Sequence, residues 1–148
     1  MKLDRILVPV DFSATSEKAL GCAADLAEKL GASIDVLYVW SPPHYFSPDL
    51  MLAIPGWTVT SLEQYARAEA VKDMEKFMGR FNRPGVRVKT RIDVGRPAAA
   101  IVRVASEEKF DLIVMGTHGL TGLSRVLLGS VAQEVVAKAP CLVMTVKQ

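Results

Sequence analysis

Short apolar runs and longer helical repeats alternate along this chain, and the alternation predicts its elements. Almost continuous apolar runs, typical of strands buried on both faces, lie at 5–10, 34–40, 111–115 and 141–146. Between these runs, apolar residues recur at helical spacing in segments that begin near Ser13, Leu62, Pro97 and Gly129. In residues 86–92, apolar residues alternate with Arg87, Lys89 and Arg91, which predicts a strand with one solvated face.

Several of the predicted helices have suitable residues at their ends. Ser13 can cap the first helix, with Glu17 near its positive end, and Gly31 supplies the stop. Pro97 suits the first turn of the third helix, because no N–H is needed there. The second helix is expected to begin near Leu62 and to include Phe81.

The order of elements predicts the fold class. Strands that alternate with helices form a parallel sheet covered on both faces, and a doubly wound open sheet fits this chain best. We expect one α/β domain of Rossmann-like type over residues 1–148. Ligands of such sheets bind at the carboxyl ends of the strands, near the point where the strand order reverses. The loops after Val10, Trp40 and Met115 meet at that edge.

The composition excludes several classes of protein. Hydrophobic residues make up 50% and charged residues 23% of the 148 residues, which is a normal globular balance. The net charge of +2 and the lack of a basic run do not support nucleic-acid binding. No apolar stretch approaches the ~18–20 residues that span a bilayer, and the N-terminus does not resemble a signal peptide.

The two cysteines indicate a reducing environment. Cys22 and Cys141 form no CxxC pair and lie in apolar patterns, so we interpret them as buried structural thiols. We therefore expect a soluble cytoplasmic protein without a membrane partner.

Four of the ten glycines lie in the stretch GTHGLTGLSRVLLGS, from Gly116 to Ser130. Without a Cβ at Gly116, a sugar can lie against the strand end, and Gly119 and Gly122 permit a positive φ that converges N–H groups on an anion. Gly129 and Ser130 open a helix whose N-terminus favours phosphate, and the Ser130 hydroxyl suits phosphate or Mg²⁺. The alternative is a flexible connection in which Ser130 only caps the helix, and spacing alone leaves both interpretations open.

The glycine stretch lacks the spacing of better-known phosphate loops. It contains neither GxxxxGK[ST] nor any lysine, which excludes a P-loop. The first strand leads into PVDFSATS, without the GxGxxG of dinucleotide-binding proteins. A phospho-accepting receiver domain would gather acidic residues at its strand ends, whereas Asp11 stands alone after the first strand.

Three segments carry a recognisable pattern across the whole chain: ILVPVDFS, GRPAAAI and DLIVMGTHGLTGLSRVLLGSVAQEVVAKAPCLVM. Together they resemble the universal stress protein family. The spacing from Gly116 to Ser130 is similar to the G-x2-G-x9-G-[ST] signature of the subgroup that binds ATP. The resemblance implies a five-stranded sheet in the order 3-2-1-4-5 and an ATP ligand, with Mg²⁺ as a candidate companion of the phosphates. It implies ATP-binding residues at Pro9, Val10, Asp11, Val39, Met115, Gly116, His118, Gly119, Gly129, Ser130 and Val131.

Several of these residues have a second interpretation. Asp11 meets the adenine or ribose end in similar proteins, but it also suits the turn before the first helix. Val39 resembles the family position whose backbone reads the adenine edge, and it fits the strand core as well. Met115 packs against the nucleotide or is a core methionine. His118 faces phosphate or solvent, and Arg125 pairs with phosphate or with a carboxylate of a neighbouring chain.

Two further segments suggest contacts beyond the nucleotide. Residues 41–60 are long for a strand-to-helix connection and rich in apolar side chains, so they suit a lid, a subunit contact or an irregular packed excursion. His44 within them has no recognisable partner. In the implied order, the apolar strand 141–146 is a sheet edge, and the same strand of a second copy is its simplest cover. We expect a homodimer through that strand, as relatives form.

The chemistry on offer favours a binder over an enzyme. Phosphoryl transfer depends on positioning, metal and charge stabilisation, and this chain lacks a loop lysine and a second carboxylate at the strand ends. We expect an ATP-binding, stress-response or regulatory protein with at most weak ATPase activity, and we assign no catalytic residue. The alternatives are a slow Mg²⁺-dependent ATP hydrolase and a dimeric scaffold that binds no nucleotide.

Overall fold

The apolar runs form one parallel sheet, as the alternating pattern predicts. Its strands stand in the order β3-β2-β1-β4-β5. Their bounds are β1 (Arg5–Val10), β2 (Ser33–Trp40), β3 (Arg87–Val94), β4 (Leu112–Gly116) and β5 (Leu142–Val146). The computed structural model describes residues 1–42, 56, 59–119 and 128–148. The order 3-2-1-4-5 confirms the predicted doubly wound α/β fold.

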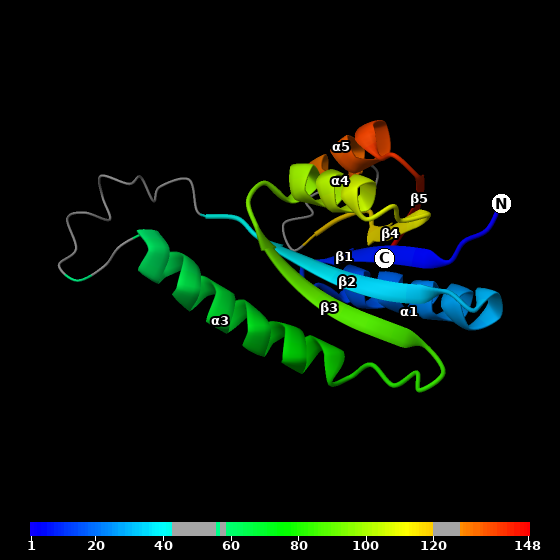
Figure 1. Ribbon diagram of the computed structural model, residues 1–148, viewed down its shortest axis with the longest axis horizontal. Coiled ribbons are helices and arrows are strands. Elements are labelled where there is room, and N and C mark those ends of the chain that lie inside the picture. Colours follow the sequence, from blue (N-terminus) through cyan, green and yellow to red (C-terminus); the bar gives the residue numbers. More distant parts are fainter. Residues whose placement is uncertain (43–55, 57–58, 120–127) are drawn as a thin grey trace.

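Helices cover both faces of the sheet (Figure 1). Their bounds are α1 (Ala14–Leu30), α3 (Val59–Met78), α4 (Pro97–Glu107) and α5 (Ser130–Lys138). Helices α1 and α3 pack on one face around Ile6, Val8 and Val36, and α4 and α5 pack on the other around Leu7 and Ile113. No helix in the described ranges is long and apolar enough to cross a membrane.

The helix ends follow the predicted chemistry, with one exception. Ser13 is the N-cap of α1 and accepts a hydrogen bond from the Ser16 N–H at 3.2 Å, while Gly31 ends the helix with φ 70°. Pro97 is in the first turn of α4. Helix α3 ends at Met78, and Gly79 follows it, so Phe81 lies beyond the helix although its side chain still packs against the core.

The basic alternation in β3 is only in part a solvated face. Arg87 and Lys89 are exposed, as expected. Arg91 instead donates from Nε to Oδ2 of Asp35 at 2.7 Å and also bonds Glu108 at the end of α4. Asp35 on β2 is 3% exposed, and burying a carboxylate requires such a partner. The prediction for Arg91 was wrong because Asp35 could not be recognised as an inward-facing acid.

The sheet ladder is short at the point where the strand order reverses. The β1–β4 register consists of Ile6↔Leu112 and Leu7↔Ile113, although β1 runs on to Val10 and β4 to Gly116. Pro9 has no N–H to contribute to a ladder there. Beyond Leu7, therefore, the backbones of β1 and β4 are not joined by ladder pairs in the described strands. This is the carboxyl edge at which doubly wound sheets bind ligands.

Candidate functional site

The two ends of the glycine stretch are held together by the backbone. The Gly129 N–H donates to the Thr117 carbonyl at 2.7 Å, and the Thr117 N–H donates to the Val146 carbonyl at 2.9 Å. Residues 117–119, directly after β4, are thereby held beside the start of α5. Residues 120–127, which include Gly122 and Arg125, lie outside the described residues, as does His44.

The start of α5 offers donors to an anion. Gly129 is its N-cap, and the Gln133 N–H donates to the Gly129 carbonyl at 2.9 Å. The N–H groups of Ser130, Val131 and Ala132 have no acceptor within the helix, and the helix dipole adds positive potential at this end. The Gly129 N–H already donates its hydrogen bond to the Thr117 carbonyl. Such an end suits a phosphate group.

Ser130 does not cap the helix. It is the first helical residue and is exposed, and no side chain makes a cap hydrogen bond there. The capping alternative considered for Ser130 is therefore wrong, because Gly129 holds the extended N-cap conformation instead, with φ −61° and ψ 157°. A Cβ built on Gly129 would lie 3.1 Å from the Thr117 carbonyl oxygen, so a side chain there would press on the closing hydrogen bond.

Asp11 lies between the loop after β1 and the loop after β4. Its Oδ1 accepts a hydrogen bond from the Ser13 N–H at 3.0 Å, which is the turn role considered for it. Its Oδ2 points at Gly119, where a Cβ would lie only 2.4 Å away. The carboxylate thus contacts the backbone of the glycine stretch as well as the start of α1.

At Gly116 and Gly119, the structure requires a glycine for reasons that differ from the expected ones. The φ of Gly119 lies outside the left-handed region, so the expected positive φ is wrong, and the Asp11 carboxylate explains the missing side chain. At Gly116, a Cβ would lie 2.7 Å from Cγ2 of Thr15 on α1. Close packing of α1 against the end of β4 therefore already requires a glycine at position 116, whether or not a sugar lies there.

The remaining predicted residues surround the same edge from inside the sheet. Val10 packs on the α1 face, whereas the Val39 and Met115 side chains belong to the core on the α4 and α5 face. Pro9 is buried in β1 opposite Leu37. The last β1–β2 pair is Val10↔Tyr38, so Val39 has a register partner on β3 only. Its backbone thus lacks a ladder partner on β1, while its side chain is core.

One of the two ring nitrogens of His118 has a hydrogen-bond partner. Its Nδ1 lies 3.0 Å from Oγ1 of Thr117, and its Nε2 is buried. In the part of the chain that the structure describes, Nε2 is the one buried side-chain polar atom without a hydrogen-bond partner. Buried polar nitrogen normally has such a partner, so a ligand oxygen would complete this site.

Sequence reasoning missed three residues of this region. Thr15 packs on Gly116, Thr117 closes the loop, and Phe12 has a φ of 64°. A bulky residue rarely adopts that conformation. Here it places the centroid of the Phe12 ring 4.5 Å from the centroid of the Tyr38 ring. Positive φ at a phenylalanine has no sequence signal. The place of Thr117 directly after Gly116 would have been a reason to consider it.

Among the described residues, few charged side chains lie near the site. Asp11 is the carboxylate at the end of β1, and the described residues contain no group of three or more His, Cys, Asp or Glu side chains suited to a metal ion. A divalent cation here would depend on oxygens that a ligand brings, such as those of a polyphosphate.

Comparison with known proteins agrees with the fold and with the sequence pattern. The model of the universal stress protein family matches residues 2–147. Universal stress protein MJ0531 of Methanocaldococcus jannaschii is 38% identical over 146 residues, covering 97% of this chain and 82% of that protein. The structure of MJ0577, from the same organism, has a TM-score of 0.82 at 31% identity and covers 100% of this chain and 98% of its own.

A more distant structure shares the fold. The universal stress protein from Archaeoglobus fulgidus in complex with dAMP has a TM-score of 0.60 at 23% identity, covering 99% of this chain and all of that one. With a family model that spans residues 2–147 and a relative 38% identical over 97% of this chain, this chain belongs to the universal stress protein family.

Proposed function

We propose that the protein binds ATP in the crevice between the ends of β1 and β4 and acts as a regulatory binder. The observation that carries this proposal is the hydrogen bond from Gly129 to Thr117. It holds the positive end of α5 beside residues 117–119, while Asp11 contacts Gly119 from the other side. Phosphate donors and an acidic group for a ribose or a base are thereby grouped at one edge.

The proposed phosphate end is the start of α5. The N–H groups of Ser130 and Val131 and the buried Nε2 of His118 supply donors for phosphate oxygens. The exposed hydroxyl of Ser130 can share a Mg²⁺ ion with the phosphates. Gly116, Gly119 and Gly129 keep side chains out of this space.

The proposed adenosine end is the end of β1 and β2. Pro9 and Val10 form the apolar wall, Asp11 accepts hydrogen bonds from ribose or adenine, and the Val39 backbone reads the adenine edge. Met115 supports the wall from the core. The dAMP complex of the Archaeoglobus fulgidus protein supports an adenine ligand for this fold.

We propose binding rather than efficient hydrolysis. A phosphoryl-transfer site needs charge stabilisation around the γ-phosphate, and the stretch from Gly116 to Ser130 contains no lysine. With Mg·ATP we expect turnover below ~1 per second, the lower end of ordinary enzyme rates. A higher rate, lost in Gly129→Val, would identify an ATP hydrolase instead.

We propose further that the protein is a cytoplasmic homodimer joined through 141–146. Strand β5 is an edge of the sheet, and Leu142 on it is 47% exposed. An apolar edge strand is a surface that proteins usually cover. Light scattering at micromolar concentration tests this, with a dimer expected for the protein and a monomer for Leu142→Lys. A monomer in both would refute the dimer.

Calorimetric titration with ATP tests the proposed function. We expect one-site binding to the protein, at least tenfold weaker binding to Gly129→Val, and unchanged binding to Gly85→Ala. The last variant is a matched control, because a Cβ on Gly85 meets no atom within 4 Å. Equal heats in the protein and in Gly129→Val would favour a scaffold that binds no nucleotide at this site.

A further inference from the structure

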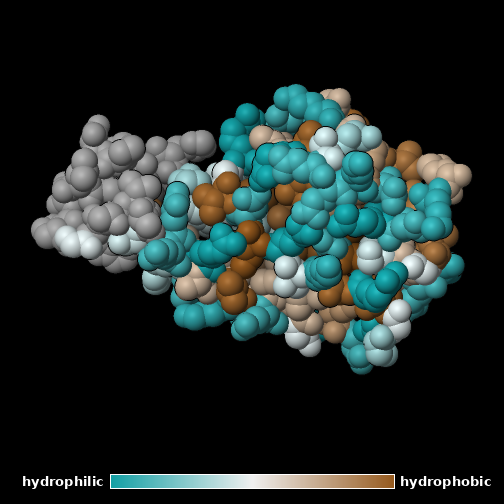
Figure 2. Space-filling model, in the orientation of Figure 1, coloured by the Kyte–Doolittle hydropathy of each residue, from teal (hydrophilic) through white to brown (hydrophobic). Residues whose placement is uncertain are grey.

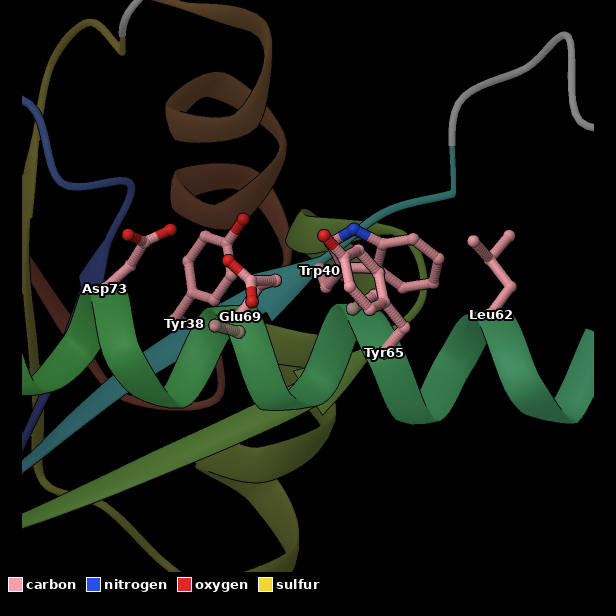
Figure 3. Close-up of a pocket in the computed structure, with 8 residues that line it drawn as sticks. Tyr38, Trp40, Leu62, Tyr65, Glu69 and Asp73 are labelled. Atoms are coloured by element: carbon pink, nitrogen blue, oxygen red, sulfur yellow. The ribbon is translucent and has the colours of Figure 1, made fainter.

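A hollow lies away from the start of α5, between β2 and the first half of α3. It is an open groove of 270 Å³. Its walls come from both elements: Tyr38, Trp40, Leu62, Tyr65, Ala66, Glu69, Ala70 and Asp73. In Figure 3 the labelled side chains stand in a row along one side of α3, with Asp73 at one end and Leu62 at the other.

Helical and strand periodicity explain why these residues share the groove. The α3 residues recur three or four positions apart, which places them on one helix face. Tyr38 and Trp40 are alternate residues of β2 and lie on the same face of the sheet. Small side chains at Ala66 and Ala70 leave the space open, whereas farther along the helix Met74 and Phe77 fill the space against the core.

The groove combines aromatic walls with negative charge. Tyr38, Trp40 and Tyr65 supply ring faces, and Glu69 and Asp73 supply carboxylates. Lys72 pairs with Glu69 at 2.7 Å and offsets part of that charge, whereas among the described residues no ion pair involves Asp73. Burial raises the pKa of Tyr38, and the negative charges of Asp73 and Asp11 raise it further.

The surface around the groove is partly apolar. Tyr65 is 57% exposed, which is high for a large ring. In Figure 2 brown, apolar atoms lie beside the grey segment and also in other parts of that face, between teal, hydrophilic atoms. An open groove with aromatic and apolar walls and with carboxylates at Glu69 and Asp73 is complementary to a compact ligand that is apolar and positively charged at once.

We propose that this groove binds a small organic ammonium ion, with its positive group between the aromatic rings and Asp73. Ring faces attract cations through their quadrupoles, and a carboxylate at the end of the groove fixes the position of the charge. The volume lies just below the ~300–1,000 Å³ of sites for drug-sized ligands, which limits the occupant to a small molecule. The proposal does not rest on nucleotide binding, since the groove lies on the α3 face of the sheet, whereas the Val39 side chain beside the proposed adenosine end lies on the other face.

Fluorescence of Trp40 provides a direct test. The chain has two tryptophans, so Trp57→Phe leaves Trp40 as the only one. Choline is the probe, and 3,3-dimethylbutan-1-ol, a neutral molecule of the same shape, is its control. Without nucleotide present, we expect a saturable change in Trp40 emission with choline, with a dissociation constant on the order of 1 mM, and a far weaker response to the alcohol.

Variants identify the groups responsible. In the Trp57→Phe background, Asp73→Asn should weaken choline binding about fivefold, as loss of one partly solvated charge implies. Glu75→Gln, an exposed carboxylate on the same helix outside the groove lining, should leave binding unchanged. Ala70→Leu should abolish binding by filling the groove.

Two results would overturn the proposal. The first is an equal change in Trp40 emission with choline and with the neutral alcohol, which would show that the groove binds apolar surface without recognising the positive charge. The second is an Asp73→Asn variant that binds choline as the parent does, whether or not Ala70→Leu folds. A loss of ATP binding at α5 would change neither outcome, so the two sites are tested separately.

Discussion

A Cβ atom on Gly119 would lie 2.4 Å from Oδ2 of Asp11, well inside van der Waals contact. The two residues follow different strands, β1 and β4, and the contact places an acidic oxygen directly on the backbone of the glycine stretch. Since Oδ1 of the same carboxylate accepts the Ser13 N–H, Asp11 has little room to withdraw. The glycine and the acid therefore depend on one another.

The first prediction concerns this contact. Gly119→Ala should displace the Asp11 carboxylate, strain its hydrogen bond to Ser13 and weaken ATP binding about tenfold, because a part-buried hydrogen bond to a charged group is worth about 1–2 kcal/mol. Calorimetry on Gly119→Ala and on Gly85→Ala measures the effect against a glycine with free space. If Asp11→Ala and the double variant bind ATP equally, the effect acts through Asp11. Unchanged binding in Gly119→Ala would show that the carboxylate is not a nucleotide contact.

A second prediction concerns the buried acid of β2. Arg91→Met leaves the Asp35 carboxylate, 3% exposed, without its 2.7 Å partner. We expect the free energy of unfolding in urea to fall by about 2–4 kcal/mol, at the lower side of values for broken buried pairs because Arg91 is itself part-exposed. Arg87→Met, on the same strand but exposed, should change it by less than about 0.5 kcal/mol. Equal effects of the two variants would contradict the ion network.

A third prediction concerns acid stability. Hydrogen bonds from Arg91, and then from Arg5, hold the pKa of Glu108 below its usual value. A lowered folded-state pKa contributes stability that is present above the unfolded pKa, about 4.3, and is lost as the pH falls through the folded value. The difference in unfolding free energy between the protein and Glu108→Gln should therefore shrink between about pH 5 and pH 3. A constant difference would show that Glu108 acts without its charge.

A fourth prediction tests the helix α1. Gly21 lies inside this helix, and a Cβ there meets no atom within 4 Å. Gly21→Ala should raise the unfolding free energy by about 0.5–1 kcal/mol, because alanine loses less backbone entropy in a helix. Gly31→Ala should do the opposite, since Gly31 has a φ of 70°. Thermal denaturation of both variants measures the pair, and a gain in both would contradict the assigned helix end.

The fold was predictable because its signals are local. Apolar runs gave the strands, and Ser13, Gly31 and Pro97 gave helix ends within a residue. The family resemblance implied the strand order 3-2-1-4-5, and the strands of the structure pair in that order. We expected Phe81 in a helix because the apolar periodicity of the sequence continues past Gly79. The helical backbone, however, ends at Met78.

The site was predictable in outline only. The glycine stretch and Asp11 were recognised, but the reasons for Gly116 and Gly119 lie in contacts with Thr15 and Asp11, which are about a hundred residues away. The buried position of Asp35 and the groove along α3 could not be predicted from the sequence for the same reason. Both depend on which element packs on which face, and single-sequence patterns do not carry that information.

The most direct test of the account is a crystal structure of the protein with Mg·ATP. We predict electron density for the phosphates within hydrogen-bond distance of the Ser130 and Val131 N–H groups, with the adenosine beside Asp11 and the end of β2. Density for water alone at the start of α5, in crystals that contain saturating Mg·ATP, would contradict the proposed nucleotide site.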